Sequence, residues 1–271
     1  TPDILNAANS LISRNENRIP KDLVSHREKG HMVTCMPAAN GGEEAKAAAL
    51  EIKKLHESGR KYSDMAILYR AHYVTRNLEE ALLKADIPYT IYSGAQFFDR
   101  MEIKDALCYL RMIAYKDDMA FRRIVNKPKR NIGKRRMDFL TQKAEEEHIS
   151  LYEALKLNLE DPLFKKTKAA DFIELIEYFA KESQGKPVSE VLSAILDESG
   201  YEEMLRTEGS QERLDDLAEL KQSIFEYEAS AGEETSIADY LEQAALFSNM
   251  DRTPGNDSVR LMRVLTAKGL E

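Results

Sequence analysis

The 271-residue sequence has no long apolar run, only two cysteines and no Walker A pattern. A membrane-spanning helix needs about 18 or more consecutive apolar residues, so no membrane span is expected. Cys35 and Cys108 each lie in an apolar stretch, which predicts buried free thiols in a reducing cytosol rather than a disulfide or a metal site. The five histidines show no metal-ligand spacing, and the missing Walker A loop leaves no cradle for nucleotide phosphates.

Charge is distributed unevenly along the sequence. The net charge is −8, which by itself argues weakly against an anionic partner such as nucleic acid. Residues 119–137 nevertheless contain eight basic residues and no acidic one, whereas residues 186–251 contain 17 acidic and four basic residues. Such segregation often marks an interaction surface for an anion in the basic segment and an acidic surface elsewhere.

The hydrophobic pattern changes character near residue 116. Up to residue 115, helical patterns alternate with strand patterns, which predicts a parallel sheet with helices on its faces. Seven helical patterns then follow before a strand pattern returns. The sequence therefore predicts an α/β domain with a large all-α insertion, with strands at 31–38, 64–70, 87–94 and 259–265, and helices at 43–59, 75–86, 118–126, 134–147, 150–157, 168–182, 187–199, 210–230 and 236–248.

Arg70 closes the apolar strand pattern at 64–70, which is expected to be buried on both faces. Ligands of open α/β sheets bind beyond the carboxyl ends of strands, and the planar donors of an arginine there suit a phosphate. The alternative is an ordinary surface arginine at a strand end. A little further on, Asp99 and Glu102 resemble a capping box at the start of a helix. The plain interpretation of Phe97 and Phe98 is core packing.

Residues 126–140 join two helices through Pro128 and Gly133. The exposed amides at the start of the second helix face outward with the positive end of the helix dipole. The bases around them make this hairpin suitable for phosphate, and especially for a nucleic-acid backbone. The alternative is a solvated basic face.

Several of these segments, in this order, resemble superfamily 1 DNA helicases of the UvrD/PcrA/Rep type. "AILYR" (66–70) resembles motif IV of that family, and "SGAQFFDRMEIKDALCYLR" (93–111) resembles the segment after it. "NKPKRNIG" (126–133) resembles the helical-hairpin motif, and "VRLMRVLTAKGLE" (259–271) resembles motif V. The opening stretch 4–21 resembles the segment just after motif III, so the resemblance covers essentially the whole chain.

The resemblance implies a fold and a domain organisation. Residues 1–115 would be the first part of a RecA-like motor domain, 2A, of the P-loop NTPase class. Residues 116–254 would be the all-helical inserted domain 2B, and residues 255–271 the return to 2A as far as motif V. The chain is then expected to be a piece of a longer protein, whose first motor domain carries the ATP-binding loop and the Mg²⁺ ligands.

The resemblance also assigns roles to individual residues. Arg70 matches the motif IV arginine that contacts ATP phosphate, and Glu271 matches the motif V glutamate that contacts the ribose. The hairpin residues match those that hold duplex DNA ahead of the fork: Lys129, Arg130, Asn131, Ile132, Gly133 and Lys134. The motif V turn near single-stranded DNA corresponds to Thr266, Ala267 and Gly269.

Three positions depart from the family pattern. Asn131 stands where the hairpin usually has its first glycine, and asparagine tolerates left-handed backbone better than most residues. Arg263 and Leu265 replace the threonine and histidine that usually precede the motif V turn, which puts the single-strand contact and its coupling to ATP in question.

The function implied by the resemblance is that of an ATP- and Mg²⁺-dependent 3′-to-5′ DNA helicase. It would act in repair, replication or recombination in the bacterial cytosol, on single strands and at junctions with duplex DNA. The chain alone is expected to be inactive on ATP. One alternative is a DNA- or protein-binding module with a weakened motor, whose protein partners would bind through 2B. Another is an α/β domain with a helical insertion and no nucleic-acid role.

Overall fold

The computed structural model describes residues 1–16, 23–92, 94–231, 235–248 and 257–267. The chain divides into two compact units, residues 1–44 and 45–271. The first unit contains α1 (Pro2–Ile12) and the start of α2 (Gly41–Glu57). Residues 31–38 have no regular secondary structure, so the strand predicted there is wrong. Cys35 in this stretch is exposed rather than buried, while Cys108 is half-buried and burial raises the pKa of its thiol to about 11.

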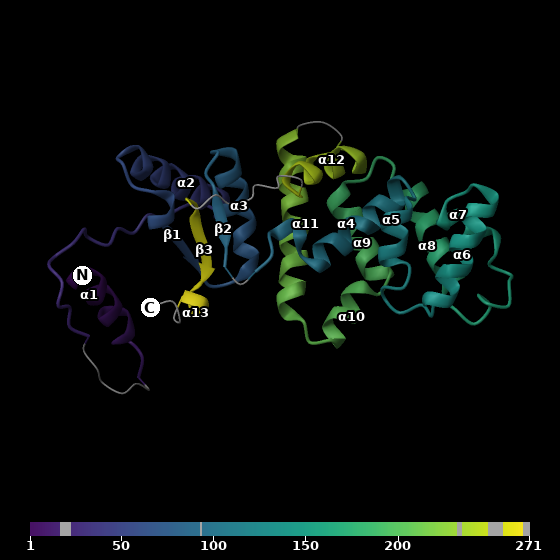
Figure 1. Ribbon diagram of the computed structural model, residues 1–271, viewed down its shortest axis with the longest axis horizontal. Coiled ribbons are helices and arrows are strands. Elements are labelled where there is room, and N and C mark those ends of the chain that lie inside the picture. Colours follow the sequence, from purple (N-terminus) through teal and green to yellow (C-terminus); the bar gives the residue numbers. More distant parts are fainter. Residues whose placement is uncertain (17–22, 93, 232–234, 249–256, 268–271) are drawn as a thin grey trace. The chain divides into compact units, whose positions relative to one another are not determined.

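A three-stranded parallel sheet lies in the second unit, with strand order β1-β3-β2 (Figure 1). The strands are β1 (Ala66–Tyr69), β2 (Tyr89–Ile91) and β3 (Val259–Arg263). The last strand in sequence is therefore the central one. It pairs Tyr69 of β1 with Arg263, and Ile91 of β2 with Leu261. This register brings the carboxyl ends of strands far apart in sequence to one edge.

One face of the sheet packs against helices α2 and α3 (Thr75–Lys84). Tyr69 and Leu261 lie on this face because side chains alternate along a strand, and they share an apolar cluster with Ile52 of α2 and Leu82 of α3. The sequence predicted that the strand at 64–70 is buried on both faces. On the face away from α2 and α3, however, Leu68 of β1 is 53% exposed, so the prediction is wrong for this strand.

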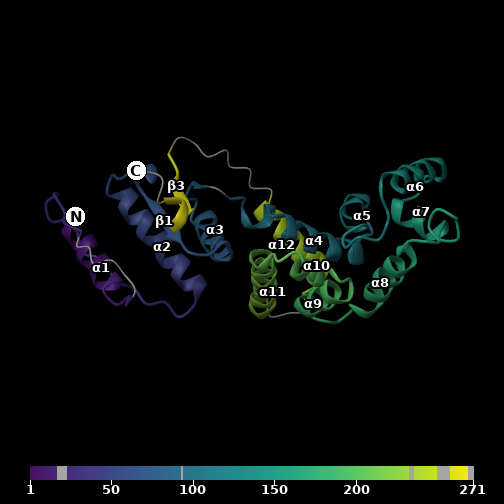
Figure 2. The same ribbon diagram turned by 90° about the horizontal axis from the view of Figure 1, so that it is seen from below.

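Residues 97–248 form a helical part with its own apolar core (Figures 1 and 2). Its helices follow the spacing of apolar residues, and seven of them match the predicted ranges to within two residues. Short 3₁₀ helices are η1 (Tyr62–Asp64), η2 (His72–Val74) and η3 (Phe97–Asp99). The α-helices of this part are α4 (Met101–Ala114), α5 (Asp118–Ile124), α6 (Lys134–Glu147), α7 (Leu151–Leu157), α8 (Ala169–Glu182), α9 (Val188–Glu198), α10 (Tyr201–Thr207), α11 (Gln211–Ala231) and α12 (Ile237–Ser248).

Helix α4 belongs to the core of the helical part, although the sequence placed it before the insertion. Phe97 and Phe98 are buried in the same core, which confirms the core-packing interpretation. The apolar packing thus changes between Ile91 and Phe97, while the domain boundary itself stays a prediction. The capping box is wrong, because α4 begins after Arg100 without a side-chain cap and Asp99 instead pairs with Lys104 at 2.6 Å.

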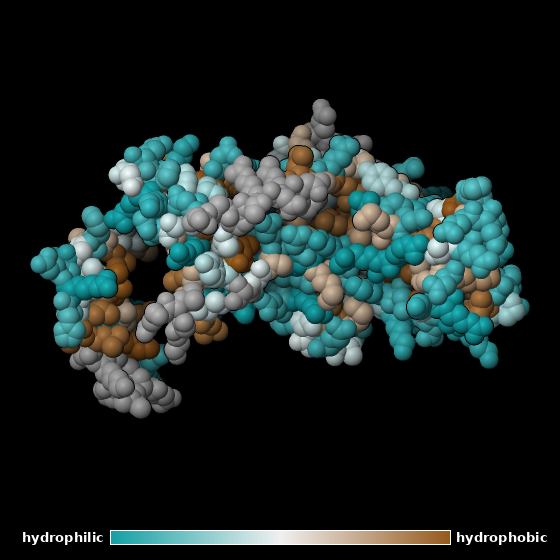
Figure 3. All heavy atoms as spheres, in the orientation of Figure 1, coloured by the Kyte–Doolittle hydropathy of each residue, from teal (hydrophilic) through white to brown (hydrophobic). Residues whose placement is uncertain are grey.

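The described surface is largely polar. Figure 3 shows hydrophilic side chains over most of the visible face of the helical part, with scattered apolar residues between them. Among the residues that the structure describes, no helix is long and apolar enough to cross a membrane.

Candidate functional site

The basic hairpin connects α5 to α6 and is shaped by a single asparagine side chain. Oδ1 of Asn126 accepts the backbone N–H groups of Arg130 at 2.8 Å and Ile132 at 3.1 Å. Asn131 between them has a φ of 61°, so the prediction that asparagine supports a left-handed turn here is confirmed. Ile132 is 2% exposed and packs in the helical core. Its side chain therefore positions the turn and faces away from any ligand.

Arg130 is also turned inward, with only 5% of its surface exposed. Its guanidinium donates to the carbonyl oxygens of Ile124 at 3.1 Å and Lys127 at 3.0 Å, and to the hydroxyl of Tyr109 at 3.2 Å. The guanidinium carbon lies 5.0 Å from the ring centroid of Phe172 on α8. These contacts use the donors of Arg130 inside the protein. The structure therefore argues against the predicted contact between this side chain and nucleic acid.

Three further bases of the segment are engaged in internal contacts. Asp105 of α4 is 1% exposed and accepts from Arg123 at 2.6 Å and from Lys127 at 3.0 Å. Arg136 donates from Nη1 to the carbonyl oxygen of Asn131 at 2.8 Å. Charge count alone did not separate these residues from ligand-binding ones. In the sequence, Asp105 appears only as an acidic residue of an amphipathic helix, and nothing there marks it as the partner of these bases.

The other four bases are exposed. Lys129, Lys134 and Arg135 lie just before or in the first turn of α6, whereas Arg122 belongs to α5 and donates to the hydroxyl of Thr141 at 3.2 Å. Gly133 is the N-cap of this 14-residue helix, and its side chain position is open, since an added Cβ would meet nothing within 4 Å. The first amides of α6 are at the positive end of the helix, and Lys134 and Arg135 belong to the same first turn. We call the hairpin surface the set Lys129, Asn131, Gly133 and Lys134, flanked by Arg135.

A second group of predicted residues lies at the carboxyl edge of the sheet. Arg70 follows β1 directly and is exposed. Thr266 and Ala267 belong to α13 (Val264–Ala267), a short turn of helix that follows β3 and lies against β1. Gly269 and Glu271 lie outside the described residues. The structure therefore brings Arg70 and the start of the motif V turn to one edge, and the hairpin surface belongs to the helical part.

Buried ion pairs connect α3 and the start of α4 to α11, and sequence reasoning missed them. Arg76 is 3% exposed and pairs with Glu219 at 2.6 Å and Glu226 at 2.9 Å. Arg100 pairs with Asp216 at 2.7 Å. The partners are more than 100 residues apart in sequence, so no local pattern reveals them.

Glu79 of α3 is a buried acid at the same junction. Its carboxylate accepts the backbone N–H of Phe97 at 3.1 Å and lies 3.5 Å from the hydroxyl of Tyr89. Burial raises the pKa of Glu79 from 4.5 to about 7, because removal from water disfavours the charged form. The carboxyl therefore titrates near neutral pH.

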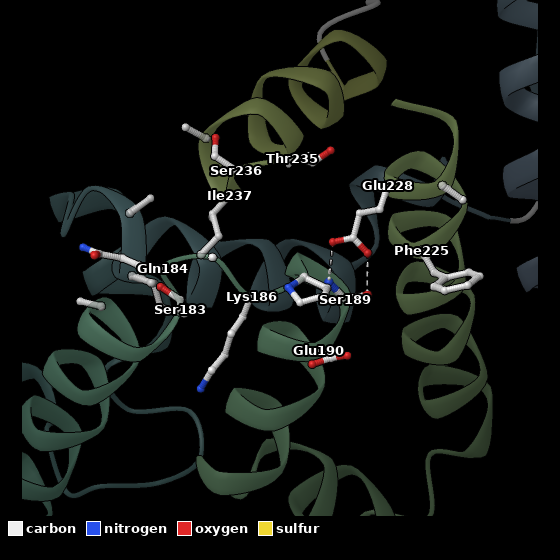
Figure 4. A pocket seen from close by; sticks show the side chains of 17 residues that line it. Ser183, Gln184, Lys186, Ser189, Glu190, Phe225, Glu228, Thr235, Ser236 and Ile237 are labelled. Carbon is white, nitrogen blue, oxygen red and sulfur yellow. Dashed lines mark hydrogen bonds between the residues drawn. The ribbon is translucent and has the colours of Figure 1, made fainter. Parts of the chain in front are cut away.

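A large cavity lies elsewhere, between the α8–α9 turn and helices α11 and α12. Its volume is about 700 Å³, and Figure 4 shows the side chains that line it. Glu228 of α11 accepts the N–H of Val188 and the hydroxyl of Ser189, and so caps α9. Lys186 lies 3.8 Å from Glu182. Glu228 and Lys186 thus both have partners within the protein, and the sequence predicted no ligand for either of them.

Known proteins resemble this chain over its whole length. Residues 1–271 match the family described as UvrD-like helicase C-terminal domain. The chain is 39% identical over 278 residues to the ATP-dependent DNA helicase PcrA of Staphylococcus epidermidis, and 37% identical to that of Staphylococcus aureus. Each alignment covers 100% of this chain and 38% of the relative, so the chain spans just over a third of their length. The chain belongs to the UvrD-like helicase C-terminal domain family, within the UvrD/PcrA group of superfamily 1 helicases.

Proposed function

We propose that this chain is the C-terminal motor region of an ATP-dependent DNA helicase that moves 3′ to 5′ in repair, replication or recombination. Support comes from the match over the whole chain and from relatives that are named ATP-dependent DNA helicases. ATP and Mg²⁺ would be held mainly by another part of the protein, because this chain has no Walker A loop. The sheet would be the 2A motor domain and the helical part the 2B insertion.

In this proposal the hairpin surface holds the backbone of duplex DNA at a junction. The observation that carries it is the division of the bases, in which four have buried or backbone partners and three, Lys129, Lys134 and Arg135, are exposed around a helix start. Buried Arg130 gives the turn a fixed shape, while Lys129 and Lys134 remain available for phosphate. Backbone amides and lysines contact phosphate without sequence information, so duplexes of any sequence are expected to bind.

At the carboxyl edge of the sheet, Arg70 would contact the phosphates of ATP from the 2A side. Phosphoryl transfer depends on positioning and on neutralising charge, and an exposed arginine at the end of a parallel strand suits that role. Thr266 and Ala267 would lie near the single strand, together with Gly269, and Glu271 would contact the ribose. These roles rest on the family pattern and on the shared edge of the sheet.

Duplex binding tests the role of the hairpin surface. The chain would be titrated onto a duplex with a single-stranded tail at several salt concentrations. The test variant is Lys129→Ala/Lys134→Ala, and the matched control is Lys181→Ala/Lys186→Ala, which removes two exposed lysines around the end of α8. Each duplex phosphate contact contributes about 0.9 to the log–log salt slope, so the test variant should flatten the slope by nearly two.

The control variant should keep the parent slope. Equal salt slopes for the test and control variants would show that the hairpin is an ordinary solvated basic surface and not a duplex-binding site. Loss of binding to a bare single strand in the same proportion as to the duplex would also contradict the proposal.

A further inference from the structure

Two adjoining clefts of the helical part run along the surface between α9 and α11. The first is the cavity beside Glu228, of about 700 Å³, and the second has a volume of about 500 Å³. Both are lined by Ser189, Glu190 and Phe225, so they form one continuous groove, which we call the α9–α11 groove. Figure 4 shows Glu190 and Phe225 on the two neighbouring helices.

Phe225 is an exposed aromatic side chain at the place where the two clefts meet. It is 59% exposed, although Ile224 next to it is buried in the helical core. The wider end of the groove is also lined by apolar side chains, namely Ile113, Ala114, Pro187, Ala229 and Ile237. Large aromatic residues near the centre of a surface are frequent anchors of protein interfaces. The groove therefore offers apolar area and one anchor to a partner.

Helix α9 contributes a row of small side chains to the groove. Ser189, Ser193 and Ala194 lie on its outer side, while its apolar residues are buried in the core. The hydroxyl of Ser189 donates to Glu228 at 2.6 Å, and that of Ser193 donates to the carbonyl oxygen of Ser189 at 2.9 Å. Small side chains whose hydroxyls already have acceptors allow another helix to approach closely. The shape of the groove thus suits a helix that lies along α9 and α11.

The groove also carries two acidic side chains that have no cationic partner. Glu190 and Asp197 are both exposed, and among the residues that the structure describes neither forms an ion pair. Lys221 lines the groove as well, but it pairs with Glu202. Asp197 lies in the last turn of α9, where the negative end of the helix dipole disfavours an acid. The two acids are seven residues apart, or about 10.5 Å along the helix axis.

We propose that the α9–α11 groove binds a basic amphipathic helix of a partner protein. The apolar face of that helix packs on Phe225 and the wider end of the groove. Two of its basic side chains, spaced by two helical turns, pair with Glu190 and Asp197. The surrounding surface attracts such a partner, because residues 186–251 carry 17 acidic and four basic residues. The inference goes beyond the proposed function, since this binding requires neither DNA nor ATP.

Synthetic peptides serve as the probes. The test peptide is a fluorescein-labelled helix of about eighteen residues, or five helical turns, with leucines on one face and two arginines seven residues apart. A scrambled peptide keeps the composition and the charge but has no apolar face. A reversed peptide has glutamates in place of the two arginines. Binding to the 271-residue chain is followed by anisotropy, and thermal melting checks that each variant is folded.

Two variants of the chain change the groove, and each has a matched control. Phe225→Ala removes the aromatic anchor, and Tyr178→Ala removes an aromatic side chain of α8 that is 51% exposed and lies outside the groove. Glu190→Lys/Asp197→Lys reverses both charges of the groove. Its control is the reversal of two exposed acids of α6, Glu145→Lys/Glu147→Lys.

The parent should bind the test peptide at least about tenfold more tightly than the scrambled one, because an apolar face adds to the attraction of charge. Phe225→Ala should weaken binding by about tenfold or more, as is typical of an aromatic anchor. Glu190→Lys/Asp197→Lys should weaken it by roughly tenfold, which is the combined strength of two exposed ion pairs. The same variant should bind the reversed peptide more tightly than the parent does. Both controls should behave as the parent.

The proposal is overturned if the test and scrambled peptides bind equally, since the attraction would then be one of charge alone. It is also overturned if Phe225→Ala binds as Tyr178→Ala does, or if the charge reversal gives no gain with the reversed peptide. Absence of any binding would contradict it as well. Binding to the chain but not to the full-length protein would show that another segment of the same polypeptide occupies the groove, and would also overturn it.

Discussion

Arg130 offers the sharpest separation of a structural base from a nucleic-acid contact. Arg130→Ala would remove the guanidinium bonds to the carbonyl oxygens of Ile124 and Lys127 and to the hydroxyl of Tyr109, together with the contact on the Phe172 ring. Each carbonyl keeps one other donor, the N–H of Lys127 for Ile124 and the hydroxyl of Tyr109 for Lys127. A hydrogen bond to a charged group contributes about 1.5–3 kcal/mol, and a desolvated cation–π contact about 1–2 kcal/mol. The bonds share one guanidinium and are not additive, so we expect a loss of about 3–5 kcal/mol.

The assay is urea denaturation of Arg130→Ala beside Arg135→Ala. Arg135 is the exposed neighbour on α6, and removing an exposed side chain changes the free energy of unfolding by no more than about 0.5 kcal/mol. Duplex binding would be measured on the same samples under conditions where both are folded. A conservative Arg130→Lys variant should recover only part of the stability, because an ammonium cannot reach several acceptors at once.

Two results would refute this reasoning. A loss of less than about 1 kcal/mol for Arg130→Ala would show that the internal contacts are unimportant. Full stability combined with lost duplex binding would show instead that Arg130 contacts the phosphate backbone directly.

Three other predictions concern Glu79, Arg70 and Gly133. Because burial raises the pKa of Glu79 from 4.5 to about 7, the folded protein keeps a proton that the unfolded chain releases between these pH values. The free energy of unfolding should therefore fall by up to about 3 kcal/mol as the pH rises across this window. Glu79→Gln should remove this dependence of the unfolding free energy on pH, as measured by urea denaturation at several pH values. The same pH dependence in the variant and the parent would contradict the prediction. In the full-length protein, Arg70→Ala should cut ATP turnover strongly and leave DNA affinity nearly intact; unchanged turnover would remove Arg70 from the site. Gly133→Val should lower the free energy of unfolding by no more than about 1 kcal/mol, because an added Cβ meets nothing within 4 Å and only the N-cap preference for glycine over valine is lost. It should bind duplex less tightly because the side chain blocks close approach to phosphate, and normal binding would contradict this.

The helical part could be predicted well because its elements are defined by local spacing. Apolar residues at helical intervals placed α6 at Lys134–Glu147, and the preference of asparagine for left-handed backbone anticipated Asn131. The strand patterns at 64–70, 87–94 and 259–265 anticipated β1, β2 and β3, although β3 ends at Arg263 and α13 begins at Val264. Helix α10 was missed because its sequence has only three apolar residues, Tyr201, Met204 and Leu205, whereas α5 and α7 of the same length have more.

The errors share a physical cause, which is competition from partners distant in sequence. Residues 31–38 have strand-like composition, but a strand forms only where another strand accepts its hydrogen bonds. The expected cap of α4 failed because Arg100 is held by Asp216 in an ion pair across 116 residues. The sequence shows that residues 119–137 are basic, but it does not show which of these side chains point into the protein and which point to solvent. Only the fold reveals that Arg130 faces the core while Lys129 faces solvent.

Site-specific crosslinking tests most directly whether the hairpin surface holds duplex DNA. A photoreactive side chain would replace Lys129 in the full-length protein, and the same group at Lys181 would serve as the control. The DNA is a duplex with a single-stranded tail, and the crosslinked position on each strand is then mapped. Position 129 should crosslink to the duplex ahead of the junction, at positions that do not depend on base sequence, and position 181 should not. Crosslinks from position 129 only to the single-stranded tail, or equal yields from the two positions, would contradict the assignment.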